Sequence, residues 1–210
     1  MVIAIDGPAG TGKSTISAII AKKLGITYLN SGSFYRALTL ALNETDISTE
    51  DANRVAEFCR AQKLDYENSR LVLNGVDVED RLHEDAVSSR VALVSSIVDV
   101  RHFVNERMRE ITKSLSIVCE GRDMTTVVFP NADYKFYLDA SIEVQAERRY
   151  KQGVSNLTLE EIREAIKKRD EIDRNKSEGA LYRAKDAIYI DTSALTIDEV
   201  CEIIISKIHS

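Results

Sequence analysis

The chain has 210 residues, of which 44% are hydrophobic and 30% are charged, and its formal net charge is −6. This length suits one α/β domain with a small insertion, and the apolar share can fill a core. The negative charge argues against non-specific binding to nucleic acid, and no apolar run is long enough to predict a membrane span. The first strand begins at once, which leaves no room for a signal peptide. Cys59, Cys119 and Cys201 lack metal-ligand spacing and are expected to be free thiols, so the sequence favours a soluble protein of the reducing cytoplasm.

Residues 7–14 read G-P-A-G-T-G-K-S, which is the phosphate-binding P-loop pattern. An apolar strand at Val2–Ile5 precedes the loop, and apolar residues at helical spacing follow it as far as Gly25, a typical C-cap residue. A glycine-rich turn that binds nothing is the alternative, and both flanks argue against it. The stretch therefore predicts a strand, a phosphate-binding loop and a helix that together bind a nucleoside triphosphate.

The residue types of this loop fit that chemistry. Glycines let the backbone wrap closely round an anion, and the N–H groups at the helix N-terminus point at the phosphates. Lys13 supplies a mobile positive charge for the β- and γ-phosphates, and the Ser14 hydroxyl can ligate Mg²⁺. The residues expected to bind ATP are Gly7, Pro8, Ala9, Gly10, Thr11, Gly12, Lys13, Ser14 and Thr15.

Apolar segments and turn signals further along the chain predict alternating strands and helices. In the first half of the chain we expect a strand at 26–29, a helix to about 42 capped by Ser31 or Gly32, a helix at 49–63, and short strands at 64–66 and 71–73 with an Asn74-Gly75 turn signal. In the second half we expect a helix at 97–111, strands at 117–119 and 134–138, and helices from 141 and 158 separated by a break at Gly153–Asn156. A strand at 187–190 and a helix at 196–208 complete the chain. This order around a P-loop predicts a P-loop NTPase fold with three α/β/α layers and a central parallel sheet.

The polar hairpin interrupts the alternation, so residues 34–95 are interpreted as an insertion that covers a second substrate; a surface excursion without function is the alternative. Arg36, near a strand-to-helix junction beside the P-loop, is either a second anion-binding residue or an ordinary surface arginine. Glu120 to Asp123 form a polar cluster after a core strand, where ligands bind in open α/β sheets.

Basic side chains lie on both sides of the short break near residue 153. A helical hairpin with cations at both ends of its turn is typical of a mobile lid that holds phosphates, although many of its charges form ordinary i,i+4 pairs. The arginines in question are Arg148, Arg149, Arg169 and Arg174.

Several segments, in register over nearly the whole chain, share one family pattern. They are 28–32, 73–78, the E-G-R-D…V-V-F-P block at 120–130, 146–152, 169–175 and 186–191. Together they resemble the bacterial cytidylate kinases, and the 120–130 block is much more specific than the P-loop alone. The resemblance implies the nucleoside monophosphate kinase fold and transfer of the γ-phosphoryl group of ATP to CMP or dCMP with Mg²⁺. The chain itself is expected to act as a monomer, without a nucleic-acid or membrane partner.

The resemblance carries residue roles with it. The implied acceptor-binding residues are Ser31, Arg36 and Arg122 at the phosphate, Arg101 and Asp123 at the cytosine, Arg169 and Asp173 at the ribose, and Lys176 in the lid region. The implied catalytic set is Lys13, Arg122, Arg148, Arg149 and Arg169, with Ser14 on the metal and Asp191–Leu195 near the adenine. Residues 1–210 then form a single P-loop kinase domain with a core (about 1–33, 96–150 and 177–210), a CMP-binding insertion (about 34–95) and a lid (about 151–176).

Some positions depart from the family pattern. Ala92 stands where a serine usually helps read cytosine, which bears most on specificity, and Lys176 keeps a charge but loses the fork of an arginine. The other departures are Asn30 for an aspartate, His83 for an arginine, Thr125 for a glycine and Ala180 for a proline. The alternatives left open are a P-loop kinase for another nucleotide or small molecule, a nucleotide-binding protein without turnover, and a GTP-binding regulatory protein, for which Asn175–Glu178 only approximates the N-K-x-D guanine motif.

Overall fold

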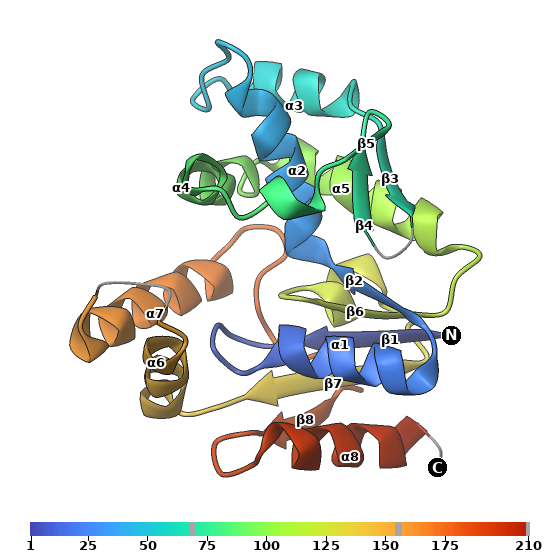
Figure 1. Ribbon diagram of the computed structural model, residues 1–210, viewed down its shortest axis with the longest axis vertical. Coiled ribbons are helices and arrows are strands. Elements are labelled where there is room, and N and C mark those ends of the chain that lie inside the picture. The colour runs from blue at the N-terminus through green and yellow to red at the C-terminus, as the bar shows by residue number, and fades with distance from the viewer. Residues whose placement is uncertain (68–69, 154–156, 209–210) are drawn as a thin grey trace. The chain divides into compact units, whose positions relative to one another are not determined.

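The computed structural model describes residues 1–67, 70–153 and 157–208 (Figure 1). The chain forms two compact units, one made of Met1–Tyr28 with Ser116–Ser210 and the other of Leu29–Leu115. The second unit is longer at both ends than the predicted insertion. Of the predicted helix break at Gly153–Asn156, only Gly153 lies among the described residues, and within these no helix is long and apolar enough to cross a membrane.

The first unit is built on a five-stranded sheet in the order β2-β6-β1-β7-β8. β1 pairs in parallel with both β6 and β7, and β7 pairs in parallel with β8. The predicted central parallel sheet is therefore confirmed, with the P-loop strand in its middle. The strands are β1 (Val2–Asp6), β2 (Thr27–Asn30), which contains the boundary between the units, β6 (Ile117–Gly121), β7 (Tyr134–Asp139) and β8 (Ile188–Asp191).

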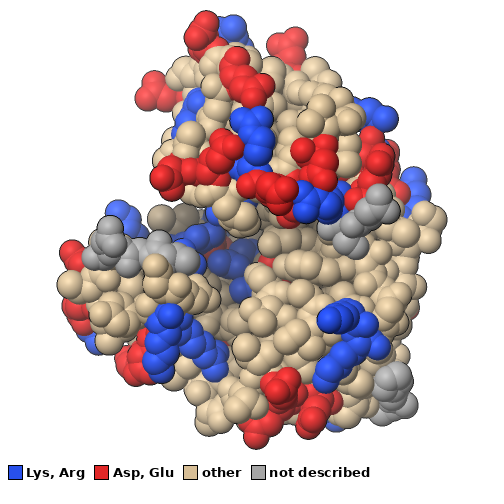
Figure 2. Space-filling view, viewed as in Figure 1, with Lys and Arg blue, Asp and Glu red and all other residues tan. Residues whose placement is uncertain are grey.

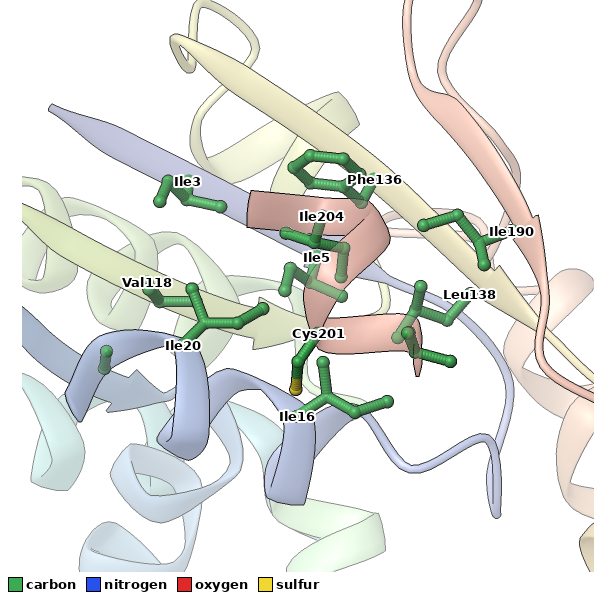
Figure 3. Packing of buried hydrophobic residues seen from close by; sticks show 12 residues of the cluster. Ile3, Ile5, Ile16, Ile20, Val118, Phe136, Leu138, Ile190, Cys201 and Ile204 are labelled. Carbon is green, nitrogen blue, oxygen red and sulfur yellow. The ribbon is translucent and has the colours of Figure 1, made fainter. Parts of the chain in front are cut away.

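Helices flank this sheet. They are α1 (Lys13–Leu24), the π-helix η2 (Met124–Val128), α6 (Ile142–Lys151), α7 (Leu159–Arg174) and α8 (Ile197–Ile208). On one face, Ile16 and Ile20 of α1 and Ile204 of α8 pack on apolar strand residues such as Ile5 and Phe136, as Figure 3 shows. Burial of this apolar cluster holds the start of α1, and with it the P-loop, at the carboxyl end of β1.

Local signals explain the helix ends. α1 stops at Gly25, which has the left-handed φ of 65° expected of a C-cap glycine. α7 begins with a capping box, in which Thr158 and Glu161 bond each other's backbone N–H groups. Both features agree with the sequence-based predictions.

The second unit contains α2 (Ser31–Asn43), α3 (Ala52–Arg60), β3 (Leu64–Glu67), β4 (Arg70–Leu73), β5 (Val76–Asp77), the 3₁₀ turn η1 (Glu79–Arg81), α4 (Asp85–Val94) and α5 (Val98–Thr112). Strands β3, β4 and β5 form an antiparallel sheet in sequence order. The Asn74-Gly75 turn, with φ of 53° and 83°, joins β4 to β5. The sequence patterns did not predict β5, which is two residues long, or α4, in which Ala86, Ala92 and Leu93 are exposed.

Two predicted helix starts in this unit were wrong. The cap of α2 is Asn30, not Ser31 or Gly32, because its Oδ1 accepts the Gly32 N–H at 2.8 Å. The helix predicted at 49–63 is shorter, since Asp51 caps it and residues 48–50 form a turn before it.

Candidate active site

The loop after β1 has the backbone expected of a phosphate cradle. Gly10 and Gly12 adopt φ of 73° and 87°, in the left-handed region that favours glycine. Gly10 also lies against helix α6, because a Cβ built on it would lie 3.0 Å from the Cβ of Gln145 and 3.1 Å from its Cα. The loop is thus shaped by backbone freedom and by close contact with α6.

Lys13, the first residue of α1, is almost fully buried, with 5% of its surface exposed. Its Nζ donates to the carbonyl of Pro8 at 2.6 Å, across the loop. Burial first, and then the nearby Arg122 charge, lower the pKa of this lysine to about 7. An anion in the loop would favour the charged form, so Lys13 is prepared to pair with a phosphate.

The Ser14 hydroxyl donates to Oε1 of Glu120 at 2.8 Å, and the Tyr28 hydroxyl donates to the same oxygen at 3.3 Å. Hydroxyl and carboxylate oxygens are the ligands that Mg²⁺ prefers, usually with substrate phosphates completing the shell. The described residues contain no group of three or more His, Cys, Asp or Glu side chains able to hold a metal ion. Ser14 and Glu120 therefore fit a metal that arrives with a nucleotide rather than one caged by the protein.

The tip of the loop contacts the α6–α7 helix pair. The Ala9 N–H donates to Oδ1 of Asp170 at 3.3 Å, and its side chain packs beside Ile162 and Ile166. Burial raises the pKa of Asp170, although the Ala9 bond and Arg122 lower it in part. A carboxylate from α7 thus occupies one of the N–H groups that a P-loop offers to phosphate.

Cations gather one turn further along α7, around Asp173 near its C-terminal end. Arg122 Nε donates to Oδ2 of Asp173 at 2.9 Å, and Lys176 Nζ donates to Oδ1 of the same carboxylate at 2.7 Å. Burial acts to raise the pKa of Asp173, but these two cations bring it below its ordinary value. Burial first, and then the charge of Arg122, lower the pKa of Arg169. Like charges held this close make an environment that an anion would stabilise.

The turn that carries Arg122 and Asp123 is held from the P-loop strand. Asp6, the last residue of β1, is fully buried and accepts hydrogen bonds from the Met124 N–H, the Thr125 N–H and the Thr125 hydroxyl. Thr125, two residues after Asp123, therefore fits in place of the glycine of the family pattern, because its hydroxyl gains Asp6 as a partner.

The two predicted arginines of α6 differ in their surroundings. Arg148 donates to Oγ1 of Thr192 at 2.9 Å and to the carbonyl of Thr192 at 2.6 Å, so it holds the segment that follows β8. Arg149 bonds the Gln152 side chain at 3.2 Å near the surface. Figure 2 shows basic side chains on the face over α6 and over the C-terminal part of α1.

The remaining predicted residues belong to the second unit. Arg36 of α2 donates to the Leu82 carbonyl at 3.0 Å and to the Ser88 hydroxyl at 2.9 Å. Arg101 of α5 lies 5.8 Å from the ring centre of Tyr35 and is buried, as is Ser31 at the start of α2. These groups are placed by packed helices rather than by loops.

The hydroxyls around Ala92 have different partners. Ser89, Ser95 and Ser96 each donate to a helix carbonyl three residues earlier. Ser88 instead accepts a bond from Arg36. Of these four serines, Ser88 is the one whose hydroxyl is joined to a predicted substrate-binding residue.

Asp6, Glu120 and Asp170 have no predicted role, although Glu120 belongs to the polar cluster that was expected to lie where ligands bind. Glu120 had a signal, since it ends a core strand, but its partner Ser14 depends on the order of the strands: β6 lies beside β1 with Glu120 opposite Ile5. Asp6 and Asp170 stand in ordinary strand and helix patterns, and no local signal separates them from structural carboxylates.

Comparison with known proteins gives a consistent result. A family model described as cytidylate kinase matches residues 3–210. The chain is 43% identical over 216 residues to the cytidylate kinase of Borrelia hermsii, a match that covers 100% of this chain and 98% of that protein. It is 42% identical over 214 residues to cytidylate kinase 1 of Borreliella afzelii, covering 100% and 97%.

Solved structures resemble this chain at low sequence identity. A shikimate kinase from Bacteroides thetaiotaomicron has a TM-score of 0.54 at 11% identity and covers 100% of this chain and 99% of that one. An uncharacterised protein from Eubacterium ventriosum has a TM-score of 0.58 at 13% identity, with coverage of 100% and 99%. At such identities these likenesses concern the fold alone.

Proposed function

The chain belongs to the cytidylate kinase family, and we propose that it transfers the γ-phosphoryl group of ATP to CMP or dCMP. In this step an oxygen of the acceptor's phosphate forms a bond to the γ-phosphorus, and the bond from that phosphorus to the β,γ-bridging oxygen breaks. The products are CDP or dCDP and ADP. The acceptor phosphate is already an anionic nucleophile, so the site needs positioning and cations rather than a general base.

The observation that carries the proposal is the assembly of charged groups around the P-loop. Lys13, Ser14 and Glu120 lie at the start of α1 and the end of β6, and Arg122 lies two residues beyond Glu120. On the ATP side, we assign residues 7–15 to the phosphates, Lys13 to the β- and γ-phosphates, and Arg148 to holding the segment 192–195 beside the adenine.

Ser14 and Glu120 would hold Mg²⁺, which supplies charge neutralisation at the β- and γ-phosphate oxygens when it is bound with ATP. The Ser14 hydroxyl must turn from Glu120 to present its lone pairs, and the 2.8 Å contact keeps both oxygens within reach of one ion. Lys13 must leave the Pro8 carbonyl to meet phosphate, exchanging a neutral partner for a charged one.

On the acceptor side, we assign Arg122, with Ser31 and Arg36, to the phosphate of CMP. Arginine suits this work because its planar fork pairs bidentately with phosphate oxygens and stays charged. The remaining assignments are Arg101 and Asp123 to cytosine, Arg169 and Asp173 to ribose, Lys176 to phosphate, and Arg149 with Arg169 to the transferring group.

The test of the function is ADP release from ATP–Mg²⁺ with CMP, dCMP, UMP, AMP and GMP offered separately. Turnover confined to CMP and dCMP is expected. A preference for another monophosphate would support a kinase but reject the cytosine assignment. No ADP release with any acceptor would reject the proposal. GTP that displaces a fluorescent ATP analogue far better than ATP would favour the GTP-binding alternative instead.

The acceptor assignment has its own test in Arg122→Ala. We expect this variant to lose about 100-fold or more in kcat/KM for CMP while the KM for ATP changes less than about threefold, because an arginine on the acceptor phosphate acts on the acceptor and the transition state. Lys167→Ala is the matched control: Lys167 is an exposed residue of α7 that pairs with Glu164 at 2.8 Å, and its loss should leave full activity. Loss of ATP affinity in Arg122→Ala would contradict the assignment.

A further inference from the structure

The π-helix η2 begins without a side-chain cap of its own. Its N-cap residue, Asp123, makes no side-chain cap hydrogen bond, although the first N–H groups of any helix lack partners within the helix. Asp6 of β1 fills this role from another element: its carboxylate accepts the Met124 N–H at 2.8 Å, the Thr125 N–H at 2.7 Å and the Thr125 hydroxyl at 2.6 Å. A residue of the P-loop strand is thus the cap of the turn that follows β6.

This cap determines the path of the two residues before it. Gly121 lies opposite Asp6 in the parallel register of β1 and β6. Arg122 and Asp123 therefore lie between two residues held by Asp6. Gly121 before them pairs with Asp6 in the sheet, and Met124 after them donates its N–H to the Asp6 carboxylate. The Arg122 side chain is held separately, by Asp173. Asp6 therefore restrains the backbone on both sides of Arg122 and Asp123, in addition to the bonds that the Asp123 carbonyl accepts from Val127 and Val128 within η2.

The carboxylate is held at a cost. Burial raises the pKa of Asp6 to about 6, and the largest opposing effect is the hydrogen bond from the Thr125 hydroxyl, followed by the two N–H bonds. The charged group that acts on it most is Asp123, which raises its pKa further. Lys13, Cys119 and Tyr137 are the other titratable groups coupled to it, from α1, β6 and β7. The Thr125 hydroxyl therefore helps to keep Asp6 ionised at neutral pH.

We propose that Asp6 and Thr125 are a positioning pair for the acceptor nucleotide: the Asp6 carboxylate, supported by the Thr125 hydroxyl, holds the turn that presents Arg122 and Asp123 to the monophosphate. The proposal rests on the proposed function, and it concerns residues to which that function assigns no role. A protonated Asp6 has one oxygen fewer to accept from the three donors, so the turn loosens and acceptor affinity falls as Asp6 gains its proton.

The experiment is calorimetric titration of CMP into the unliganded enzyme at a series of pH values, with Thr125→Val and Thr125→Ser as a matched pair. Thr125→Val keeps the shape of this buried side chain and removes its hydroxyl, whereas Thr125→Ser keeps the hydroxyl. The CMP phosphate itself titrates near pH 6, so the comparison is between variants measured with the same ligand. We expect the pH at which CMP affinity falls on acidification to be about one unit higher in Thr125→Val than in the wild type, and unchanged in Thr125→Ser.

Titration of ATP into the same proteins separates positioning from general damage. The ATP affinity of Thr125→Val should stay within about twofold of the wild type, because the P-loop contacts are untouched. Superimposable CMP profiles for the three proteins, or equal losses for CMP and ATP, would overturn the proposal. If the valine variant does not fold, Thr125→Ala offers the same loss of a hydroxyl in a smaller side chain. A wild-type enzyme that binds no CMP would instead refute the proposed function.

Discussion

Gly10→Ala perturbs the P-loop at the point where it contacts α6, and Gly25→Ala is its matched control. Both glycines adopt left-handed backbone, with φ of 73° and 65°, so an alanine costs each about 1–2 kcal/mol of strain. No atom lies within 4 Å of a Cβ on Gly25, whereas a Cβ on Gly10 would lie 3.0 Å and 3.1 Å from the Cβ and Cα of Gln145. Because Gln145 belongs to a helix, it cannot yield cheaply, and overpacking adds about 1–3 kcal/mol. We therefore expect losses of about 1–2 kcal/mol for Gly25→Ala and about 2–5 kcal/mol for Gly10→Ala.

Urea denaturation at equilibrium measures both values, with unchanged m-values as evidence that the unfolding transition is the same. ATP affinity, measured by titration on the folded variants, should fall in Gly10→Ala and remain unchanged in Gly25→Ala, because only the former reshapes the phosphate loop. Equal destabilisation by the two substitutions would refute the reasoning, since it would mean that the contact with Gln145 contributes nothing and that only backbone strain matters.

Two further predictions concern buried charges. Binding of ATP at pH 8 should be accompanied by uptake of as much as one proton, because the phosphates favour the charged form of Lys13, whose pKa is about 7 in the free protein. Calorimetry in buffers of different ionisation enthalpy measures this uptake, and zero uptake would contradict the prediction. The pKa of Asp6 rises from 3.8 to about 6 on folding, so its contribution to stability is full below pH 4 and is lost as the pH rises through 6. The free energy of unfolding of the wild type minus that of Asp6→Asn should therefore fall by about 2.4 kcal/mol between pH 4 and pH 7.5 in urea denaturation, and a flat difference would show that Asp6 does not titrate there.

Much of the first unit could be predicted from sequence because its signals are local. The G-x-x-x-x-G-K-S pattern, the apolar strand before it and the C-cap Gly25 all act within about 25 residues, and the structure confirms the strand, the loop and α1. The capping box at Thr158 is equally local and gave the correct start of α7. Predictions of helix boundaries were wrong where neighbouring polar residues could each act as the N-cap. Asn30 and Ser31 both have capping side chains, and Asn30, the last residue of β2, is the cap in the structure.

The rest of the site depends on which strands become neighbours. Ser14 meets Glu120 and Asp6 meets Thr125 only because β6 lies beside β1, and no spacing in the chain specifies that order. The contact of Arg148 with the segment after β8 could not be predicted from neighbouring residues either. A basic helix end is as typical of a phosphate-binding lid as of such a contact. The predicted division into core, insertion and lid remains a prediction, as do the individual substrate contacts.

Asp6 and Lys13 stand at the two ends of the P-loop, and burial opposes the charged form of both. The pKa values of about 6 and about 7 leave a narrow interval in which the free protein has Asp6 ionised and Lys13 protonated together. The two charges differ in what offsets their burial. Asp6 is compensated within the protein, by three donors at the start of η2, so its charge is present before any ligand arrives. Lys13 donates to neutral acceptors, the Pro8 carbonyl at 2.6 Å and the Thr11 hydroxyl at 3.5 Å, so its compensation comes with ATP. We therefore expect protonation of Asp6, which holds the turn with Arg122 and Asp123, to set the acid limit of activity, and this limit should not change when ATP binds. Deprotonation of Lys13 in the P-loop should set the alkaline limit, which should move to higher pH once ATP is bound.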